Sequence, residues 1–371
     1  AGKTTLAEAM LFNTGVLDRF GKVVDGTTTT DYDPEETKRK VSISTALAPC
    51  EWKDCKINVV DTPGYFDFVG EVKQGIKVAE SAVILVSGKS GVAVGTEKSW
   101  GYAEEQGIPR MFFINKMDEE NADFFKVLDQ LVDTFGKGLI VFQVPIIESG
   151  KFTGFVDIVN MTAKKFDKDK LVDTDIPADL NDKITELKEA FNEAVAETDE
   201  DLMEKFFGGE EFTHDEIVKG LKIGMADASI VPVYCGSAFN NQGIQTFMDA
   251  VIEFLPSPAD KPVVKAEKPE KDESVDLKAA PDAPMSAIVF KTIADPFVGK
   301  ISMFKVCSGT IKSDSSVFNT TSEKPEKIAQ VFMLRGKKQI PVDGLVAGDI
   351  GAVAKLQNTN TNDTLCDQSN R

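Results

Sequence analysis

The chain has 371 residues, 42% of them hydrophobic, and carries a formal net charge of −18 at pH 7. Its length predicts two or three domains, and its acidity argues against a broad basic surface for nucleic acid, DNA included. The five scattered cysteines and the single histidine, His214, argue against a disulfide framework, a zinc site and a Ser-His-Asp triad. No apolar run approaches the roughly 20 residues of a membrane span, so we expect a cytoplasmic protein that does not enter membranes.

The first residues, Ala1-Gly2-Lys3-Thr4-Thr5, have the form of the second half of a P-loop, and an amphipathic helix is predicted to follow. In a complete P-loop, backbone N–H groups wrap the phosphates, the lysine reaches the β- and γ-phosphates, and the hydroxyl binds magnesium. Gly2, Lys3, Thr4 and Thr5 are therefore candidate nucleotide-binding residues, with Thr4 as a metal ligand. Since no strand or first glycine precedes them, we expect the chain to begin inside the motif. The alternative is a triplet that merely starts a helix.

Residues 26–32 are polar and aperiodic, which predicts a loop, and residues 37–44 run into an extended segment that ends at Trp52. A hydroxyl in this segment, that of Ser42, would complete the coordination of magnesium and be released on hydrolysis. The alternative is an exposed loop with a chance serine.

The apolar run 57–60 predicts a buried strand, and Asp61-Thr62-Pro63-Gly64 follows it. In a nucleotide switch with this motif, Asp61 supports magnesium through water and Gly64 donates its N–H to the γ-phosphate. On its own the tetrapeptide equally fits an ordinary turn.

Two further apolar runs, 82–86 and 111–114, predict strands buried in a parallel sheet, with a helix over 94–106 between them. Asn115-Lys116-Met117-Asp118 follows the second strand. The Asp118 carboxylate would accept hydrogen bonds from N1–H and N2–H₂ of guanine, donors that adenine lacks. Asn115 would brace neighbouring loops, and the stem of Lys116 would cover the base. A charged loop between a strand and a helix is the alternative.

After a predicted helix over 121–135, the alternation of strands and helices breaks at about 145–222, which indicates an inserted subdomain. It resumes with a strand at 230–234, the residues Ser237 and Ala238, and a helix over 244–255. Residues 259–285, rich in proline and charge, predict a linker. From residue 286 a period of two predicts a small β-barrel, with strands at 288–293, 299–306, 316–319, 327–333 and 350–355.

Taken in order, Gly2-Lys3-Thr4, Ser42, the Asp61 motif, the Asn115 motif and Ser237-Ala238 make the chain resemble the translational GTPases, and elongation factor G in particular. Residues 232–239 and 255–258 match the end of that family's GTP-binding domain. Residues 294–300 and 347–353 match its second domain. The resemblance covers nearly the whole chain.

Two departures narrow the resemblance. Family members usually carry Gly-Ile-Thr-Ile where this chain has Lys40-Val41-Ser42-Ile43, and His where it has Tyr65. Together with residues 26–32 and 91–96, these two departures make the chain similar to the elongation factor G-like group that is sometimes called the second elongation factor G.

The resemblance implies an α/β P-loop GTPase domain over 1–258 with an inserted α+β subdomain, followed by an all-β barrel domain over 286–371. It implies binding of GTP or GDP and Mg²⁺. Nucleotide contacts would come from Gly2, Lys3, Thr4, Thr5, Asp61, Gly64, Asn115, Lys116, Asp118, Ser237 and Ala238. Thr4, Ser42 and Asp61 would hold the metal, and Lys3, Gly64 and Tyr65 would take part in catalysis. It further implies a monomer that contacts ribosomal RNA and stalk proteins. Because the family's later domains are absent, we interpret the chain as an N-terminal fragment.

Three functions remain open. The first is slow, ribosome-stimulated GTP hydrolysis, because a phenol, with a reference pKa of about 10, orients water but does not carry the positive charge of an imidazolium. The second is a non-hydrolysing, GTP-gated module that binds or protects the ribosome. The third is a fragment that binds no nucleotide because its first strand is missing.

Overall fold

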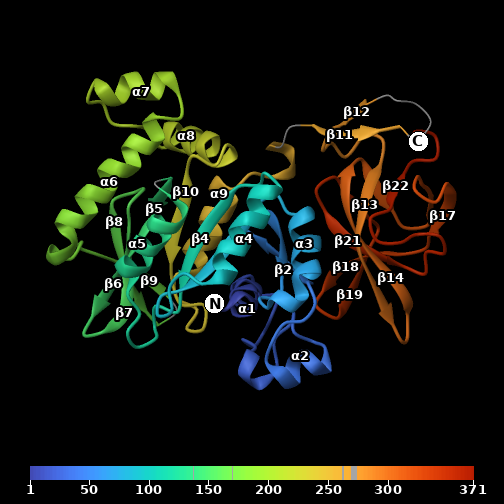
Figure 1. Cartoon of the computed structure of the whole chain (residues 1–371), viewed down its shortest axis with the longest axis horizontal. Coiled ribbons are helices and arrows are strands. Elements are labelled where there is room, and N and C mark those ends of the chain that lie inside the picture. The colour runs from blue at the N-terminus through green and yellow to red at the C-terminus, as the bar shows by residue number, and fades with distance from the viewer. Residues whose placement is uncertain (137, 169, 261–262, 269–273) are drawn as a thin grey trace. The chain divides into compact units, whose positions relative to one another are not determined.

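The computed structural model describes residues 1–136, 138–168, 170–260, 263–268 and 274–371. They form two compact units (Figure 1). The first unit comprises residues 1–20 and 81–255, and the second comprises residues 21–80 and 256–371. No helix in these described ranges is long and apolar enough to cross a lipid bilayer.

A parallel sheet in the order β3-β4-β10-β5 forms the centre of the first unit. Its strands are short apolar runs, largely buried: β3 (Ala82–Ser87), β4 (Arg110–Asn115), β5 (Leu139–Val141) and β10 (Val231–Cys235). Its helices are α1 (Lys3–Asn13), α4 (Val94–Glu105), α5 (Phe124–Phe135) and α9 (Ile244–Phe254). Helix α1 packs against α9, and α4 packs against β3. The predicted α/β class is therefore confirmed.

An inserted α+β subdomain also belongs to the first unit. Its antiparallel sheet consists of β6 (Gln143–Glu148), β7 (Lys151–Asp157), β8 (Thr162–Asp167) and β9 (Lys170–Thr174). Its helices are α6 (Asn181–Ala196), α7 (Glu200–Phe207) and α8 (His214–Ala226). Helix α6 packs on β5, where the rings of Phe142 and Phe191 lie 5.4 Å apart. The insert is thus joined to the edge of the parallel sheet by aromatic packing.

The second unit contains an antiparallel β domain in the order β17-β16-β22-β13-β14-β21-β18-β19. Its strands are β13 (Ser286–Asp295), β14 (Gly299–Ser308), β16 (Ser315–Asn319), β17 (Lys324–Ile328), β18 (Val331–Arg335), β19 (Lys338–Val342), β21 (Ile350–Ala354) and β22 (Thr364–Cys366). Strands β15 (Thr310–Lys312) and β20 (Gly344–Val346) pair with each other. Because the edge strands β17 and β19 do not pair with each other within the described ranges, the predicted barrel is a curled half-barrel.

Residues 21–80 belong to this second unit and contribute helices α2 (Pro34–Arg39) and α3 (Val69–Lys77) and strands β1 (Ala46–Trp52) and β2 (Cys55–Asp61). The two strands form an antiparallel hairpin. Strand β2 is half-buried, whereas the apolar run 57–60 predicts a fully buried strand. The difference arises because, among the described residues, β2 pairs with β1 alone.

One apolar cluster joins this segment to the β domain. Leu47 of β1 and Val78, after α3, pack with side chains of β13, β14, β18 and β21: Phe290, Ile301, Met303, Phe332, Leu334, Ile350 and Ala352. The turn between β18 and β19 reaches the same segment, where the Gly336 N–H donates to the Leu47 carbonyl at 2.8 Å. A Cβ atom on Gly336 would lie 1.9 Å from the Thr29 carbonyl oxygen. Residues 21–80 and the β domain therefore share one core.

Two details of the second unit differ from the sequence prediction. The predicted linker contains two paired strands, β11 (Val264–Glu267) and β12 (Ser274–Leu277), while its residues 261–262 and 269–273 lie outside the described ranges. The predicted strand 327–333 is instead the end of β17 and the start of β18. The chain turns between them at Gln330, whose side chain donates to the Val342 carbonyl at 2.9 Å.

Candidate functional site

The loops that follow β4 and β10 lie side by side because these strands are neighbours in the parallel sheet. Asn115, the last residue of β4, is buried and bridges them. Its Oδ1 accepts a hydrogen bond from the Ala238 N–H at 2.8 Å, and its Nδ2 donates to the Ala1 carbonyl at 2.9 Å. The Met117 N–H donates to the Gly236 carbonyl at 3.2 Å. Three segments far apart in sequence thus meet at one edge of the sheet.

Gly2 stands at the entry to helix α1 and is tightly enclosed. Its φ of +94° lies in the left-handed region, and a Cβ atom there would lie 2.6 Å from Asn115 Nδ2. Only glycine fits this position without displacing Asn115. Lys3 and Thr4 begin the helix, whose first turn carries the positive end of the helix dipole. This arrangement suits an anion.

Positive side chains gather near the start of α1. Burial, followed by the charges of Lys3 and Lys116, lowers the pKa of the Ala1 amino group. Lys116 has a φ of +67°, and its Nζ lies 2.7 Å from Glu119 Oε1. Asp118, two residues further along, is exposed. The first unit therefore places two lysines and an accessible carboxylate at the edge where these loops meet.

Ser237 and Ala238 are fully buried in the loop after β10. The hydroxyl of Ser237 accepts from the Asn240 N–H at 3.1 Å and shapes the turn. The Ala238 N–H, which would be available to the O6 atom of a bound guanine, donates to Asn115. A guanine O6 would therefore compete with the Asn115 side chain for this proton.

Asp61 lies at the end of β2 in the second unit, where it is 6% exposed. Its Oδ2 accepts a hydrogen bond from the hydroxyl of Thr30 at 2.7 Å, and Thr30 is itself buried. Sequence reasoning missed Thr30, because the run Thr27–Thr30 offers four equivalent hydroxyls and no periodicity to tell which one turns inward. The structure thus joins the polar loop 26–32 to the Asp61 motif.

Residues 64–67, which follow the buried Pro63, face solvent. Gly64 is exposed, and Tyr65, 58% exposed, precedes a short 3₁₀ turn at Phe66–Phe68. Ser42 is half-buried, and the amides of the two following residues donate to the buried carboxylate of Glu36. Glu36 was also missed, although Asp33-x-x-Glu36 has the form of a capping box, and the structure forms that box at α2.

Two protein families match successive parts of the chain. The family described as Elongation factor Tu GTP binding domain matches residues 1–257, and Elongation factor G domain 2 matches residues 284–368. The chain belongs to the translational GTPases. A crystal structure of a protein from Thermus thermophilus superposes with a TM-score of 0.88 at 30% sequence identity. The match covers 98% of this chain and 52% of the Thermus protein, so the chain spans about half the length of that relative.

In this translational GTPase, the residues at the candidate site fit a guanine nucleotide and magnesium. The start of helix α1 beside Gly2 suits phosphate oxygens. The first unit offers the hydroxyl of Thr4, and the second offers the hydroxyl of Ser42 and the carboxylate of Asp61. Magnesium prefers oxygen ligands of these kinds. No group of three or more His, Cys, Asp or Glu in the described part of the chain could hold a metal alone.

Proposed function

We propose that this chain binds GTP and GDP with Mg²⁺ and hydrolyses GTP to GDP and phosphate as a ribosome-associated factor of the elongation factor G type. Within that family we place it in the second elongation factor G group. The observation that carries the proposal is the junction at Asn115, which joins the start of α1 to the loop of Ser237 and Ala238. A guanine-specific site needs these segments together, because the phosphates and the base of one nucleotide must be held at once.

Each site residue has a role in this proposal. Gly2, Lys3, Thr4 and Thr5 cradle the phosphates, and Lys3 offsets their charge. Asn115, Lys116, Asp118, Ser237 and Ala238 select guanine. Thr4, Ser42 and Asp61 hold the magnesium ion, which when bound offsets charge on the phosphate oxygens. Gly64 donates its N–H to the γ-phosphate.

Hydrolysis requires a water molecule to be positioned for attack on the γ-phosphate. Tyr65 stands where the family usually has histidine, and its exposed phenol is a neutral group that orients water without adding positive charge. His214, the sole histidine, lies at the start of α8 in the insert, and its ring bonds Glu253 of α9 at 2.8 Å. We therefore expect slow hydrolysis and a long-lived GTP state.

Single-turnover GTP hydrolysis on ribosomes tests this expectation. Tyr65→His should hydrolyse GTP about 100-fold faster than the parent, within the range typical of a positioned acid–base group. Tyr65→Phe keeps the ring and removes the hydroxyl, so it should be slower than the parent. A fast parent that Tyr65→His does not accelerate would refute the assignment.

The alternative function is a non-hydrolysing, GTP-gated module that occupies or protects ribosomes. It uses the same base-binding residues, and the exposed Tyr65 in place of histidine is the observation that favours it. The same assay separates the two functions, because this module would show no turnover with ribosomes. Titration with a fluorescent guanine nucleotide decides whether the chain binds nucleotide at all.

The proposed partner is the ribosome, contacted through ribosomal RNA by the GTP-binding and β domains and through stalk proteins by the insert. We propose that the chain acts as a monomer in the cytoplasm. The domain boundaries proposed for it are 1–258, with the insert at about 145–222, a linker at 259–285 and the β domain at 286–371.

A further inference from the structure

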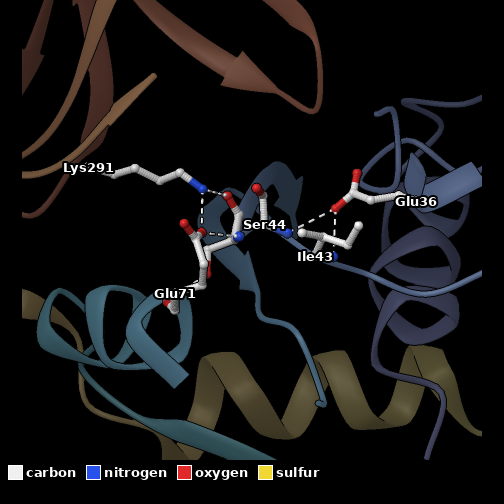
Figure 2. A network of polar contacts seen from close by, with 6 residues as sticks. Glu36, Ile43, Ser44, Glu71 and Lys291 are labelled. Carbon is white, nitrogen blue, oxygen red and sulfur yellow. Dashed lines mark hydrogen bonds and ion pairs between the residues drawn. The ribbon is translucent and has the colours of Figure 1, made fainter. Parts of the chain in front are cut away.

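Lys291 is a buried lysine on β13, and it contacts the segment that follows Ser42. Its Nζ donates to the Thr45 carbonyl at 2.9 Å and to Glu71 Oε2 of α3 at 2.5 Å (Figure 2). Thr45 completes the arrangement, since its N–H donates to Glu71 Oε2 at 2.6 Å and its hydroxyl donates to the Glu71 carbonyl at 2.7 Å. The β domain therefore holds both Thr45 and α3 through one ammonium group.

The other side of the same segment is held by α2. Glu36, 2% exposed, accepts from the Ile43 N–H at 2.9 Å and the Ser44 N–H at 3.0 Å, and Figure 2 shows it opposite Lys291. The amides of residues 43, 44 and 45 are thus all bound by carboxylates, two by Glu36 and one by Glu71. Ser42 immediately precedes them, so its backbone leads into a segment that is held at both ends.

The two ends differ in rigidity. Helix α2 has six residues, most of them exposed, so its backbone hydrogen bonds open readily. Strand β13 lies inside the β domain with β14 and β22 as neighbours. Lys291 is 5% exposed, and a buried charge that loses its partner is strongly unfavourable, so the Lys291–Glu71–Thr45 contact resists opening. The fixed end of the segment is therefore the end at the β domain.

We propose that Lys291 is a positioning residue for the nucleotide switch: it fixes residues 43–45, and through them Ser42, in the place that GTP binding requires. This inference rests on the proposed function, because it assigns the recognition of GTP over GDP partly to the β domain. GDP lacks the γ-phosphate, so its binding depends less on the position of Ser42 than GTP binding does. Loss of Lys291 therefore weakens the binding of GTP more than that of GDP.

Lys305 provides a matched control. It lies on the neighbouring strand β14, is 9% exposed, donates to the Val78 carbonyl at 2.6 Å and pairs with Glu80. Like Lys291, Lys305 therefore binds one backbone carbonyl and one glutamate side chain. Its partners follow the end of α3 and are not residues 43–45. Lys305→Met should therefore reproduce the loss of a buried lysine without releasing the Ser42 segment.

The first experiment is limited trypsin digestion of the nucleotide-free protein, followed by mass spectrometry. Lys38, Arg39 and Lys40 are exposed at the end of α2, and cleavage there requires local opening. Lys291→Met should speed cleavage at these sites about tenfold, Lys305→Met less than twofold, and Lys291→Arg should restore most of the protection. Equal cleavage in Lys291→Met and Lys305→Met would overturn the proposal.

The second experiment measures Kd for a non-hydrolysable GTP analogue and for GDP. In Lys291→Met the Kd for the analogue should rise about tenfold, while the Kd for GDP stays within twofold of the parent. A parallel rise of both values would show a merely structural role. If Lys291→Met does not fold, Glu71→Gln takes its place, since it removes the charge and keeps the size. A parent without nucleotide binding would refute the proposed function, and the trypsin result would still decide whether Lys291 holds the segment.

Discussion

Asp118 is the residue on which guanine selectivity depends in the proposed site. Inosine nucleotides lack the exocyclic amino group of guanine, so they would make one hydrogen bond fewer to this carboxylate. A hydrogen bond to a charged group contributes roughly 1.5–3 kcal/mol, so the parent should bind GDP about 10- to 100-fold more tightly than the inosine analogue. Asp118→Asn should bring this ratio close to one.

Competition titrations against a fluorescent guanine nucleotide measure both affinities. Glu120→Gln is the control, since it neutralises an exposed carboxylate two residues away and should leave the ratio at its parental value. An unchanged preference for GDP in Asp118→Asn would remove Asp118 from the base site.

Thr30 and Lys291 show what the sequence could not predict at the residue scale. The Asn115 motif and the pair Ser237-Ala238 each follow an apolar strand, β4 or β10, so the parallel sheet brings their loops to one edge. The contact between Thr30 and Asp61 joins residues 31 positions apart, through a loop without periodicity. Lys291 interrupts an apolar strand, and its burial depends on Glu71, 220 residues earlier. Such partners are set by tertiary packing, which a local pattern does not record.

Helix α8 of the insert carries a pH-dependent contribution to stability. A hydrogen bond from Lys205, followed by bonds from Thr213, lowers the pKa of Glu216 to about 2 from its ordinary value of 4.5. Because the folded pKa lies below the unfolded one, ionised Glu216 stabilises the folded state fully above about pH 5. This contribution is lost as the pH falls from 4.5 towards 2.

Glu216→Gln should therefore lower the urea midpoint at pH 7, and its difference from the parent should shrink steadily as the pH falls below 4.5. Urea denaturation between pH 3 and pH 7 measures this difference. Glu211→Gln, at an exposed carboxylate of the preceding loop, should match the parent throughout. A difference for Glu216→Gln that is the same at both ends of the range would argue against the ion pair.

At the element scale, apolar patterns predicted strands β3 and β4 closely, because both are continuous hydrophobic runs in a parallel sheet. Strand β2 has a similar run but is half-buried, since it pairs with β1 alone among the described strands. The pair β11 and β12 was missed because proline and charge dominate that stretch of sequence. Composition thus indicated an irregular linker where local pairing forms two short strands.

The boundaries of the two compact units do not coincide with the boundaries of the two family matches. Residues 1–257 match the GTP-binding domain, yet residues 21–80 are compact with the β domain rather than with the rest of that match. A fragment of residues 1–257 would expose Leu47 and Val78, and full burial of each side chain stabilises by roughly 1.5–3 kcal/mol. Its amides in residues 46–80 should exchange hydrogen at least about 100-fold faster than in the whole chain, while β3 and β4 stay protected.

Hydrogen exchange followed by mass spectrometry compares the two proteins directly. Strands β3 and β4 serve as the internal control, because their neighbours all lie in the fragment. Unchanged protection of residues 46–80 in the fragment would contradict the shared core.

The shared core also sets an order of events during synthesis. Phe290, the first β-domain member of the cluster, leaves the ribosome 212 residues after Val78, and the other members follow. At the usual rate of about 5–20 residues per second, this interval lasts on the order of 10–40 s. Until then Leu47 and Val78 lack the side chains that cover them, so this part of the nascent chain exposes apolar surface. The segment that would sense GTP is thus translated early and completes its packing late.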